Sequence, residues 1–272
     1  MRRSSTQSAH SVAHTPWRWA WAGGLLGLAL AVLLCAPARW LAAGVAQASQ
    51  GQVQLADPRG TVWDGSAQLV LAGGEGSRDS TALPERLRWQ IRPALDGLRT
   101  LLRADCCMDQ PLQLHARPHW GGAQLTLTDS QSRWPAPLLA GLGAPWNTLQ
   151  PEGTLGLSTQ GLVLDWNAGR MVLTGQARLE AIDMASRLST LKPMGSYRLT
   201  LTGGDNGNTT STVQLETLGA SSLQLVGSGQ WVGARLRFEG TATAAPDRVD
   251  ALSNLLNIIG RRDGARATIK VG

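Results

Sequence analysis

Beyond residue 50 the chain alternates between apolar and polar residues over short segments, and this period of two constrains the fold more than any other feature. Because successive side chains of a strand point to opposite faces, the alternation predicts antiparallel strands with one buried and one solvated face. Clusters of glycine between the segments predict hairpin turns. The alternating segments are 52–55, 111–114, 123–128, 161–166, 197–202, 213–215, 223–225, 235–239 and 265–271, and the glycine clusters are 73–76, 203–208 and 227–229.

Helical patterns are few in this part of the chain. Residues 135–142 are long enough for one or two helical turns, and residues 247–259 predict an amphipathic helix that ends at Gly260. The apolar stripe of that helix consists of Val249, Leu252, Leu256 and Ile259. No linker divides 50–272, so the sequence predicts one mainly β domain, built as a sandwich or as an open curved antiparallel sheet.

The amino-terminal part contains a long apolar run. Residues 20–38 include no charged residue, and as a helix they are roughly 28 Å long, close to the hydrocarbon thickness of a bilayer. Tryptophans lie on both sides of the run, and Arg2, Arg3 and Arg18 precede it, which predicts a cytoplasmic amino terminus. We therefore expect a cytoplasmic tail (1–18), a transmembrane anchor (19–41) and, in a Gram-negative cell, a periplasmic domain (50–272) held at the inner membrane.

A cleaved signal peptide is the alternative interpretation of this segment. Residues 36–38 and 46–48 both satisfy the small-x-small rule for cleavage. The apolar run is longer than the usual core of a signal peptide, which favours an uncleaved anchor. Either interpretation places the rest of the chain outside the cytoplasm.

The net charge of +6 does not indicate nucleic-acid binding. Arg2, Arg3, Arg18 and Arg39 lie in the first 40 residues without any acidic residue, and they supply most of the excess of 25 basic over 19 acidic side chains. The remainder of the chain is nearly neutral. It contains no Lys/Arg stripe with interleaved aromatics of the kind that binds nucleic acid.

Tryptophan is used eleven times, whereas Phe and Tyr occur once each. Trp63, Trp120 and Trp231 are each followed by glycine and then by an alternating segment. The pattern predicts a ring that covers the end of the core beside a tight glycine turn. Because tryptophan is also favoured at interfaces, the same three residues are candidate contacts for a protein partner.

Four segments resemble the type II secretion system protein N family. GTVWDGSAQLVL at 60–71, followed by LRWQIRPAL at 87–95, resembles the opening of that family's periplasmic part. LSTLKPMGSYRLTL at 188–201 is similar to its Leu-Ser-x-Leu-x-Pro-x-Gly-x-Tyr segment, with Met194 where leucine is expected, and 251–272 resemble its terminal helix, turn and strand. The resemblance implies an accessory inner-membrane component of the machine that exports folded proteins from the periplasm, with other components of that system as its partners.

Cys106 and Cys107, with His115 and His119 downstream, are four potential metal ligands within fourteen residues. Adjacent cysteines do not easily reach one metal, and four residues of strand separate the histidines by roughly 13 Å, so a zinc site is disfavoured. The oxidising periplasm favours disulfide chemistry instead. The sequence leaves open a bond between the two cysteines, two free thiols and a bridge to another chain.

No catalytic motif is present: the chain lacks a Gly-x-Ser-x-Gly elbow, a His-Glu-x-x-His pair and a phosphate-binding loop, so we expect neither an enzyme nor a cofactor. Two functions remain. One is a secretion component that binds other periplasmic domains through sheet edges or exposed tryptophans. The other is a lipid-binding or membrane-bridging protein of the envelope, whose sheet holds acyl chains on an apolar face. A second sheet over that face would argue against the lipid function, and an open face would permit it.

Overall fold

The computed structural model describes residues 17–74, 76–167, 170–204, 210–232 and 235–272. The chain divides into two compact units, Met1–Ala36 and Pro37–Gly272. The predicted cytoplasmic tail, 1–18, lies almost entirely outside the described residues, as does most of the predicted turn at 203–208.

The first unit contains one helix, α1 (Trp17–Leu34). Large apolar side chains of this helix, such as Leu26 and Leu28, are exposed. Among the described helices, none combines the length and the apolarity that crossing a membrane requires.

The predicted continuous anchor over 19–41 is interrupted. The first helix ends at Leu34, and a second helix, α2 (Ala38–Ala48), begins one residue after Pro37. Proline disfavours helical backbone in the residue before it, which accounts for the break. In the second unit α2 lays Ala38, Leu41 and Val45 against the sheet.

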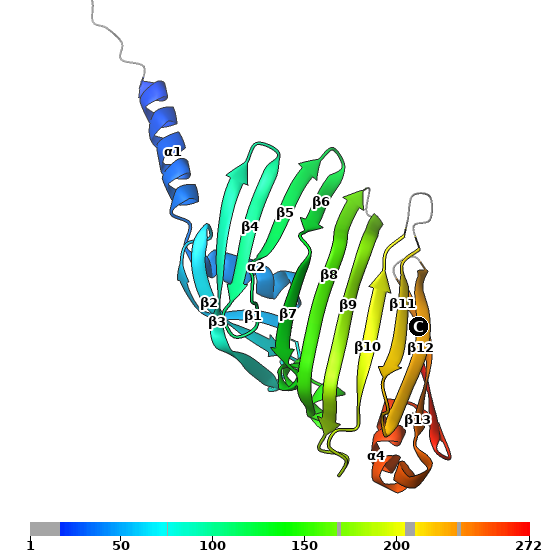
Figure 1. Ribbon diagram of the computed structural model, residues 1–272. Helices are drawn as coiled ribbons and strands as arrows, with labels where there is room; N and C mark the ends of the chain where they lie inside the picture. Colours follow the sequence, from blue (N-terminus) through cyan, green and yellow to red (C-terminus); the bar gives the residue numbers. More distant parts are fainter. Residues whose placement is uncertain (1–16, 75, 168–169, 205–209, 233–234) are drawn as a thin grey trace, which may run out of the picture. The chain divides into compact units, whose positions relative to one another are not determined.

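One antiparallel sheet of 15 strands makes up nearly all of the second unit (Figure 1). Its order follows the chain from β1 to β13, apart from β7, and ends with β15 and then β14. The edge strands are β1 and β14, so the sheet is open and the sandwich alternative is wrong. The strands are β1 (Val53–Gly60), β2 (Asp64–Ala72), β3 (Ser80–Ala94), β4 (Gly97–Ala104), β5 (Leu112–His119), β6 (Gly122–Leu127), β7 (Ser130–Pro135), β8 (Pro151–Asn167), β9 (Arg170–Ser186), β10 (Gly195–Thr202), β11 (Thr212–Leu218), β12 (Leu223–Val232), β13 (Arg235–Ala244), β14 (Arg261–Asp263) and β15 (Arg266–Val271).

The long strand β8 carries two short strands on one side. Its last residues pair with β6 and its first residues pair with β7, so β6 and β7 lie one after the other along the same neighbour. The turn after β4 lies on the other side of β7, where Met108 bridges Ser132 and the Arg133 amide donates to the Cys107 carbonyl at 2.7 Å.

Residues that face each other across paired strands share a face of the sheet. One face, called the inner face here, carries the apolar members of the pairs, for example Trp89 opposite Leu102 and Leu125 opposite Leu164. Three elements pack on this face: α2 over β1 to β3, the 3-10 helix η1 (Ala136–Leu142) over β2 and β3, and α4 (Val249–Ile259) over β13 and β15.

The two helices predicted in the β domain are confirmed. The first, expected at 135–142, is the 3-10 helix η1, and the second, expected at 247–259, is α4 preceded by the short turn η2 (Pro246–Arg248). Leu252 and Leu256 of the predicted stripe are fully buried, Val249 and Ile259 pack beside them, and the helix stops before Gly260. A further short helix, α3 (Trp146–Leu149), precedes β8.

The turn predicted at 227–229 is wrong, because these residues lie in the middle of β12. Gly227 faces Gly240 of β13, and Gly229 faces Phe238. A Cβ atom at Gly227 would meet the Phe238 ring at 2.5 Å. The glycines therefore make room for the only phenylalanine of the chain rather than reverse its direction.

Candidate functional site

The middle of the inner face is an apolar surface that α2, η1 and α4 leave uncovered. The three buried clusters of the described residues lie under α2, η1 and α4, toward the two edges of the sheet. Between them, on β5 to β11, several apolar side chains of the inner face are half-buried, whereas Leu155, Leu162, Leu173 and Val213 are buried. We call the half-buried set the apolar strip; it consists of Leu114, Leu125, Leu164, Leu199 and Leu215, on β5, β6, β8, β10 and β11.

Register divides the apolar side chains of this face into two groups, which meet β9 at Leu173 and at Leu179. Leu125 faces Leu164, which faces Leu173 of β9, and Leu199 of β10 faces Leu215. Leu157, at the other end of β8, is 38% exposed. A partner that packs on such a surface gains dispersion contacts and removes apolar area from water. The surface is therefore suited to binding rather than to catalysis.

The outer face of the same strands is polar. Arg198 of β10 reaches Glu180 of β9 and Glu216 of β11, with nitrogen to oxygen distances of 2.8 Å in both pairs. The hydrogen bonds to Glu180 and then to Glu216 raise the pKa of the Arg198 guanidinium. This row of charges identifies the outer face as the solvated one and leaves the inner face as the candidate binding surface.

Both edges of the sheet are poor sites for adding a partner strand. On β1, Pro58 lacks an amide hydrogen and the pairing with β2 shifts between Ala56 and Arg59. The other edge, β14, is three residues long. Proline, bulges and short length are the usual protections of an edge, so the structure favours the inner face over the edges as a contact surface.

The three tryptophans predicted as partner contacts are not brought together. They belong to three separate hairpins: Trp63 lies between β1 and β2, Trp120 between β5 and β6, and Trp231 near the end of β12. Trp120 is 102% exposed, so its ring does not cover the core as predicted, whereas Trp63 and Trp231 are half-buried.

The ring that closes the first hairpin is Trp89 of β3, which the sequence analysis did not single out for this role. It is 2% exposed, and its indole nitrogen donates to the carbonyls of Thr61 and Val62 at 3.2 and 3.0 Å. A Cβ atom at Gly65 would meet the ring at 2.6 Å. The signal that could have identified Trp89 is its position on the apolar side of an alternating strand, opposite Gly65 of the preceding strand.

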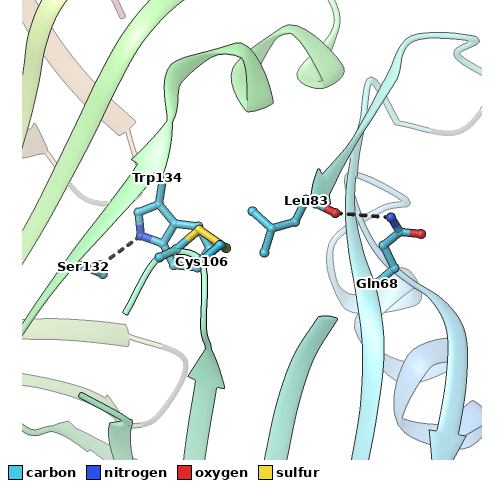
Figure 2. Close-up of a disulfide and its surroundings, with 6 residues drawn as sticks. Gln68, Leu83, Cys106, Ser132 and Trp134 are labelled. Carbon is cyan, nitrogen blue, oxygen red and sulfur yellow. Dashed lines mark hydrogen bonds between the residues drawn. A yellow bond between two sulfur atoms is a disulfide. The ribbon is translucent and has the colours of Figure 1, made fainter. Parts of the chain in front are cut away.

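Cys106 and Cys107 form a disulfide with each other (Figure 2). Figure 2 shows the Trp134 ring lying against the disulfide, with Leu83 pointing toward it from the neighbouring strand. Cys107 is buried in the apolar cluster under η1, and Cys106 is exposed. The bond lies in the turn that pairs with β7, which gives it a structural role at that junction.

The histidines lie away from the disulfide, on the outer face of β5. His115 contacts Asp96, with Nε2 3.2 Å from Oδ1, and Nε2 of His119 is 3.6 Å from Oδ1 of Asp165. Within the described residues, no three His, Cys, Asp or Glu side chains gather as a metal site would require. The zinc alternative therefore receives no support, because its four residues lie on different faces.

The titratable groups with shifted pKa values have structural causes. Hydrogen bonds from Arg86 and Arg59 lower the pKa of Asp57, and the hydrogen bond from Lys192 lowers that of Glu152. Burial raises the pKa of Tyr197, whose hydroxyl donates to the Leu223 carbonyl at 3.0 Å. Each of these three shifts belongs to an ion pair or to a buried hydroxyl.

The comparisons with known proteins give one result. A family model described as type II secretion system (T2SS), protein N, matches residues 51–269, from the segment before β1 to the last strand. No curated protein and no solved structure matches the chain.

Proposed function

Because the chain belongs to the type II secretion system protein N family, we propose that it is an accessory inner-membrane component that supports export of folded proteins from the periplasm to the exterior. The match over 51–269 is the observation that carries this proposal. In the proposed role the protein binds other components of the system and catalyses no reaction.

The contact with those components is made by the apolar strip. Its side chains are half-buried on one face of the sheet, while both sheet edges are protected. Apolar surface of this kind is typical of the centre of a protein interface. Trp120, fully exposed at a hairpin end, and the half-buried Trp63 and Trp231 are additional candidate contacts, each on its own hairpin.

The location that fits this role is the inner membrane, with the amino terminus in the cytoplasm and the β domain in the periplasm. The charge-free run at 20–38 and the arginines that precede it support this location. A reporter enzyme that is active only in the periplasm, fused after Gly272, should be active, and the fusion should sediment with inner-membrane vesicles after alkaline washing. An inactive fusion or one released by the wash would contradict the location.

A strain that lacks the gene, with its neighbours intact, tests the function. We expect an enzyme normally exported by this system to accumulate in the periplasm, while the outer membrane stays impermeable to a large antibiotic. Normal export would contradict the proposal.

One observation favours a second function, the handling of lipid: the sheet is open, and a part of its apolar face is left without a covering layer. An acyl chain is chemically suited to such a surface. This function predicts normal export with a leaky outer membrane in the same strain, and lipid that stays with the protein during purification and is detected by mass spectrometry of an organic extract.

A further inference from the structure

Two hairpins of the sheet present large apolar side chains at their turns. Ala94 pairs with Gly97, which leaves Leu95 and Asp96 as the turn between β3 and β4, and His119 pairs with Gly122, which leaves Trp120 and Gly121 between β5 and β6. Leu95 is 111% exposed and Trp120 is 102% exposed. Two-residue turns usually take Asn, Asp or Gly, so these side chains are not explained by the turns that carry them.

A third hairpin adds two more apolar side chains. Trp166 of β8 faces Met171 of β9 one pair before the described part of that hairpin ends, and both side chains are exposed. We call Leu95, Trp120, Trp166 and Met171 the tip row. None of its members belongs to a buried cluster of the described residues.

The register places the whole tip row at one end of the sheet. Leu98, at the start of β4, faces Ala116 near the end of β5, and Gly122 at the start of β6 faces both His119 and Asn167. Figure 1 shows the turn between β5 and β6 at the same end of the sheet as the turn between β3 and β4. The row therefore extends across strands β3 to β9 at a single end.

The second unit begins at this same end of the sheet. Pro37 forms a bridge with Thr61 in the turn between β1 and β2. Asp64, the first residue of β2, pairs with Gln90, whose other neighbour is Leu101 of β4. Pro37, the first residue of the second unit, thus lies at the end of the sheet that carries the tip row.

Basic side chains accompany the tip row. Arg92 of β3 faces Arg99 of β4, and both are exposed beside Leu95. Like charges that face each other across two strands repel. The nearby Asp96 does not compensate them, because it is paired with Arg117 at 2.7 Å and with His115 at 3.2 Å. Arg92, Leu95, Asp96, Arg99 and His115 line one hollow of the surface. Since Asp96 is already paired, the two arginines make the hollow suited to an anionic headgroup.

We propose that the tip row docks the β domain onto a membrane surface that contains anionic lipid, with Leu95 and Trp120 inserted at the interface and Arg92 and Arg99 bound to headgroups. Exposed leucine and tryptophan with adjacent arginines are the chemistry of interfacial membrane contacts. The docking rests on the proposed membrane location and adds to it which end of the sheet faces the bilayer. It leaves the inner face accessible to partners.

Depth-dependent fluorescence quenching tests the docking in the full chain. Cys35→Ser removes the free cysteine, and the Cys106–Cys107 disulfide offers no free thiol. One new cysteine, introduced by Leu95→Cys or by Trp120→Cys, then carries a polarity-sensitive fluorophore. Each variant keeps the other three members of the row. The matched control is Ala220→Cys in the exposed turn between β11 and β12, at the opposite end of the sheet. All three are reconstituted into vesicles of phosphatidylethanolamine and phosphatidylglycerol with a doxyl-labelled lipid.

We expect the labels at 95 and 120 to shift to shorter wavelength and to lose about twofold in intensity to the lipid quencher, as a shallow interfacial position requires. The label at 220 stays unquenched. Adding Arg92→Gln and Arg99→Gln to the chain labelled at 95 reduces the quenching, and an unchanged signal would overturn the headgroup contact. Equal and weak quenching at all three positions would overturn the docking and would leave a protein as the occupant of the row. Because these measurements do not depend on export, they can fail while the secretion function holds.

Discussion

Tryptophan residues of this chain serve opposite purposes, and their neighbours decide which. Trp89 points to the inner face, where α2, Leu102 and the glycine of the first hairpin enclose it. Trp120 occupies a two-residue turn and is fully exposed. Trp120 is followed directly by two glycines, whereas the glycine that accommodates Trp89 is Gly65 on another strand, so the flanking sequence alone did not identify Trp89 as the buried ring.

This contrast predicts different effects on stability. Trp89→Ala should lower the free energy of unfolding by about 3 to 5 kcal/mol, because it empties a buried site and removes the donor to Thr61 and Val62. Trp120→Ala should change it by less than about 0.5 kcal/mol, since the ring contacts no core. Urea unfolding of the full chain in a mild detergent, followed by circular dichroism, measures both. Similar losses in the two variants would contradict the assignment of Trp89 as the structural ring.

The single tyrosine gives a pH prediction with a direct readout. Burial raises the pKa of Tyr197 above its ordinary value of 10.0. Below that value the phenol is neutral in both states and the stability is unaffected. Above it the unfolded chain loses the proton first, so the free energy of unfolding falls by up to about 1.4 kcal/mol per pH unit.

Because Tyr occurs once in the chain, the phenolate absorbance in the near ultraviolet reports Tyr197 alone. We expect the folded protein to show this band only at a pH well above that of the urea-unfolded protein. Tyr197→Phe should remove the band. It should also lower the free energy of unfolding by about 1 kcal/mol at neutral pH, because the hydrogen bond to Leu223 is missing. The decline in stability at alkaline pH that Tyr197 causes should then be absent. If the phenol of the folded protein titrates at the same pH as that of the urea-unfolded protein, the burial of Tyr197 is contradicted.

Among the secondary-structure elements, alternation located β5, β6, β10 and β15, where one face is buried and the other is wet, but it did not locate β3, β4 or β9. This worked because the period of two is set by local geometry. It failed at β12, where Gly227 and Gly229 accommodate a ring from the neighbouring strand, since that requirement comes from another part of the chain. It also missed α2, because the first residues of this helix, 38–41, were interpreted as the end of the anchor over 19–41.

Helix α4 is the element whose role the sequence predicted best, and its two sides can be compared directly. Leu256→Ala should destabilise the protein by about 2 to 5 kcal/mol, because Leu256 is fully buried against β13 and β15. Ile258→Ala, at a side chain that is 42% exposed on the same helix, should cost less than about 1 kcal/mol. Thermal unfolding of both variants measures the difference. If the two midpoints shift equally, α4 does not close the sheet at that edge as described.

Taken together, the strands form a sheet whose order follows the chain because nearly every connection is a hairpin, and this much of the topology could be expected from alternating segments and short turns. The sequence could not show whether a second sheet closes the apolar face, since alternation is the same in a sandwich and in an open sheet. The candidate binding surface was therefore beyond sequence analysis. It depends on which strands α2, η1 and α4 leave uncovered.

The central claim is that the apolar strip on the uncovered inner face performs the function in secretion. It can be tested with charges placed on the two faces of the same two strands. Leu125→Lys with Leu199→Lys changes the strip, and Thr126→Lys with Thr200→Lys changes the next residues, which point to the outer face and are also half-buried. Equal protein levels and equal circular dichroism spectra serve as the control for folding.

The measurement is the amount of an exported enzyme in the medium and in the periplasm of the deletion strain that carries each variant. The leucine variant should leave the enzyme in the periplasm, as the deletion does, and the threonine variant should restore export. Full export with the leucine variant, at an unchanged protein level, would contradict the claim that the inner face is the working surface.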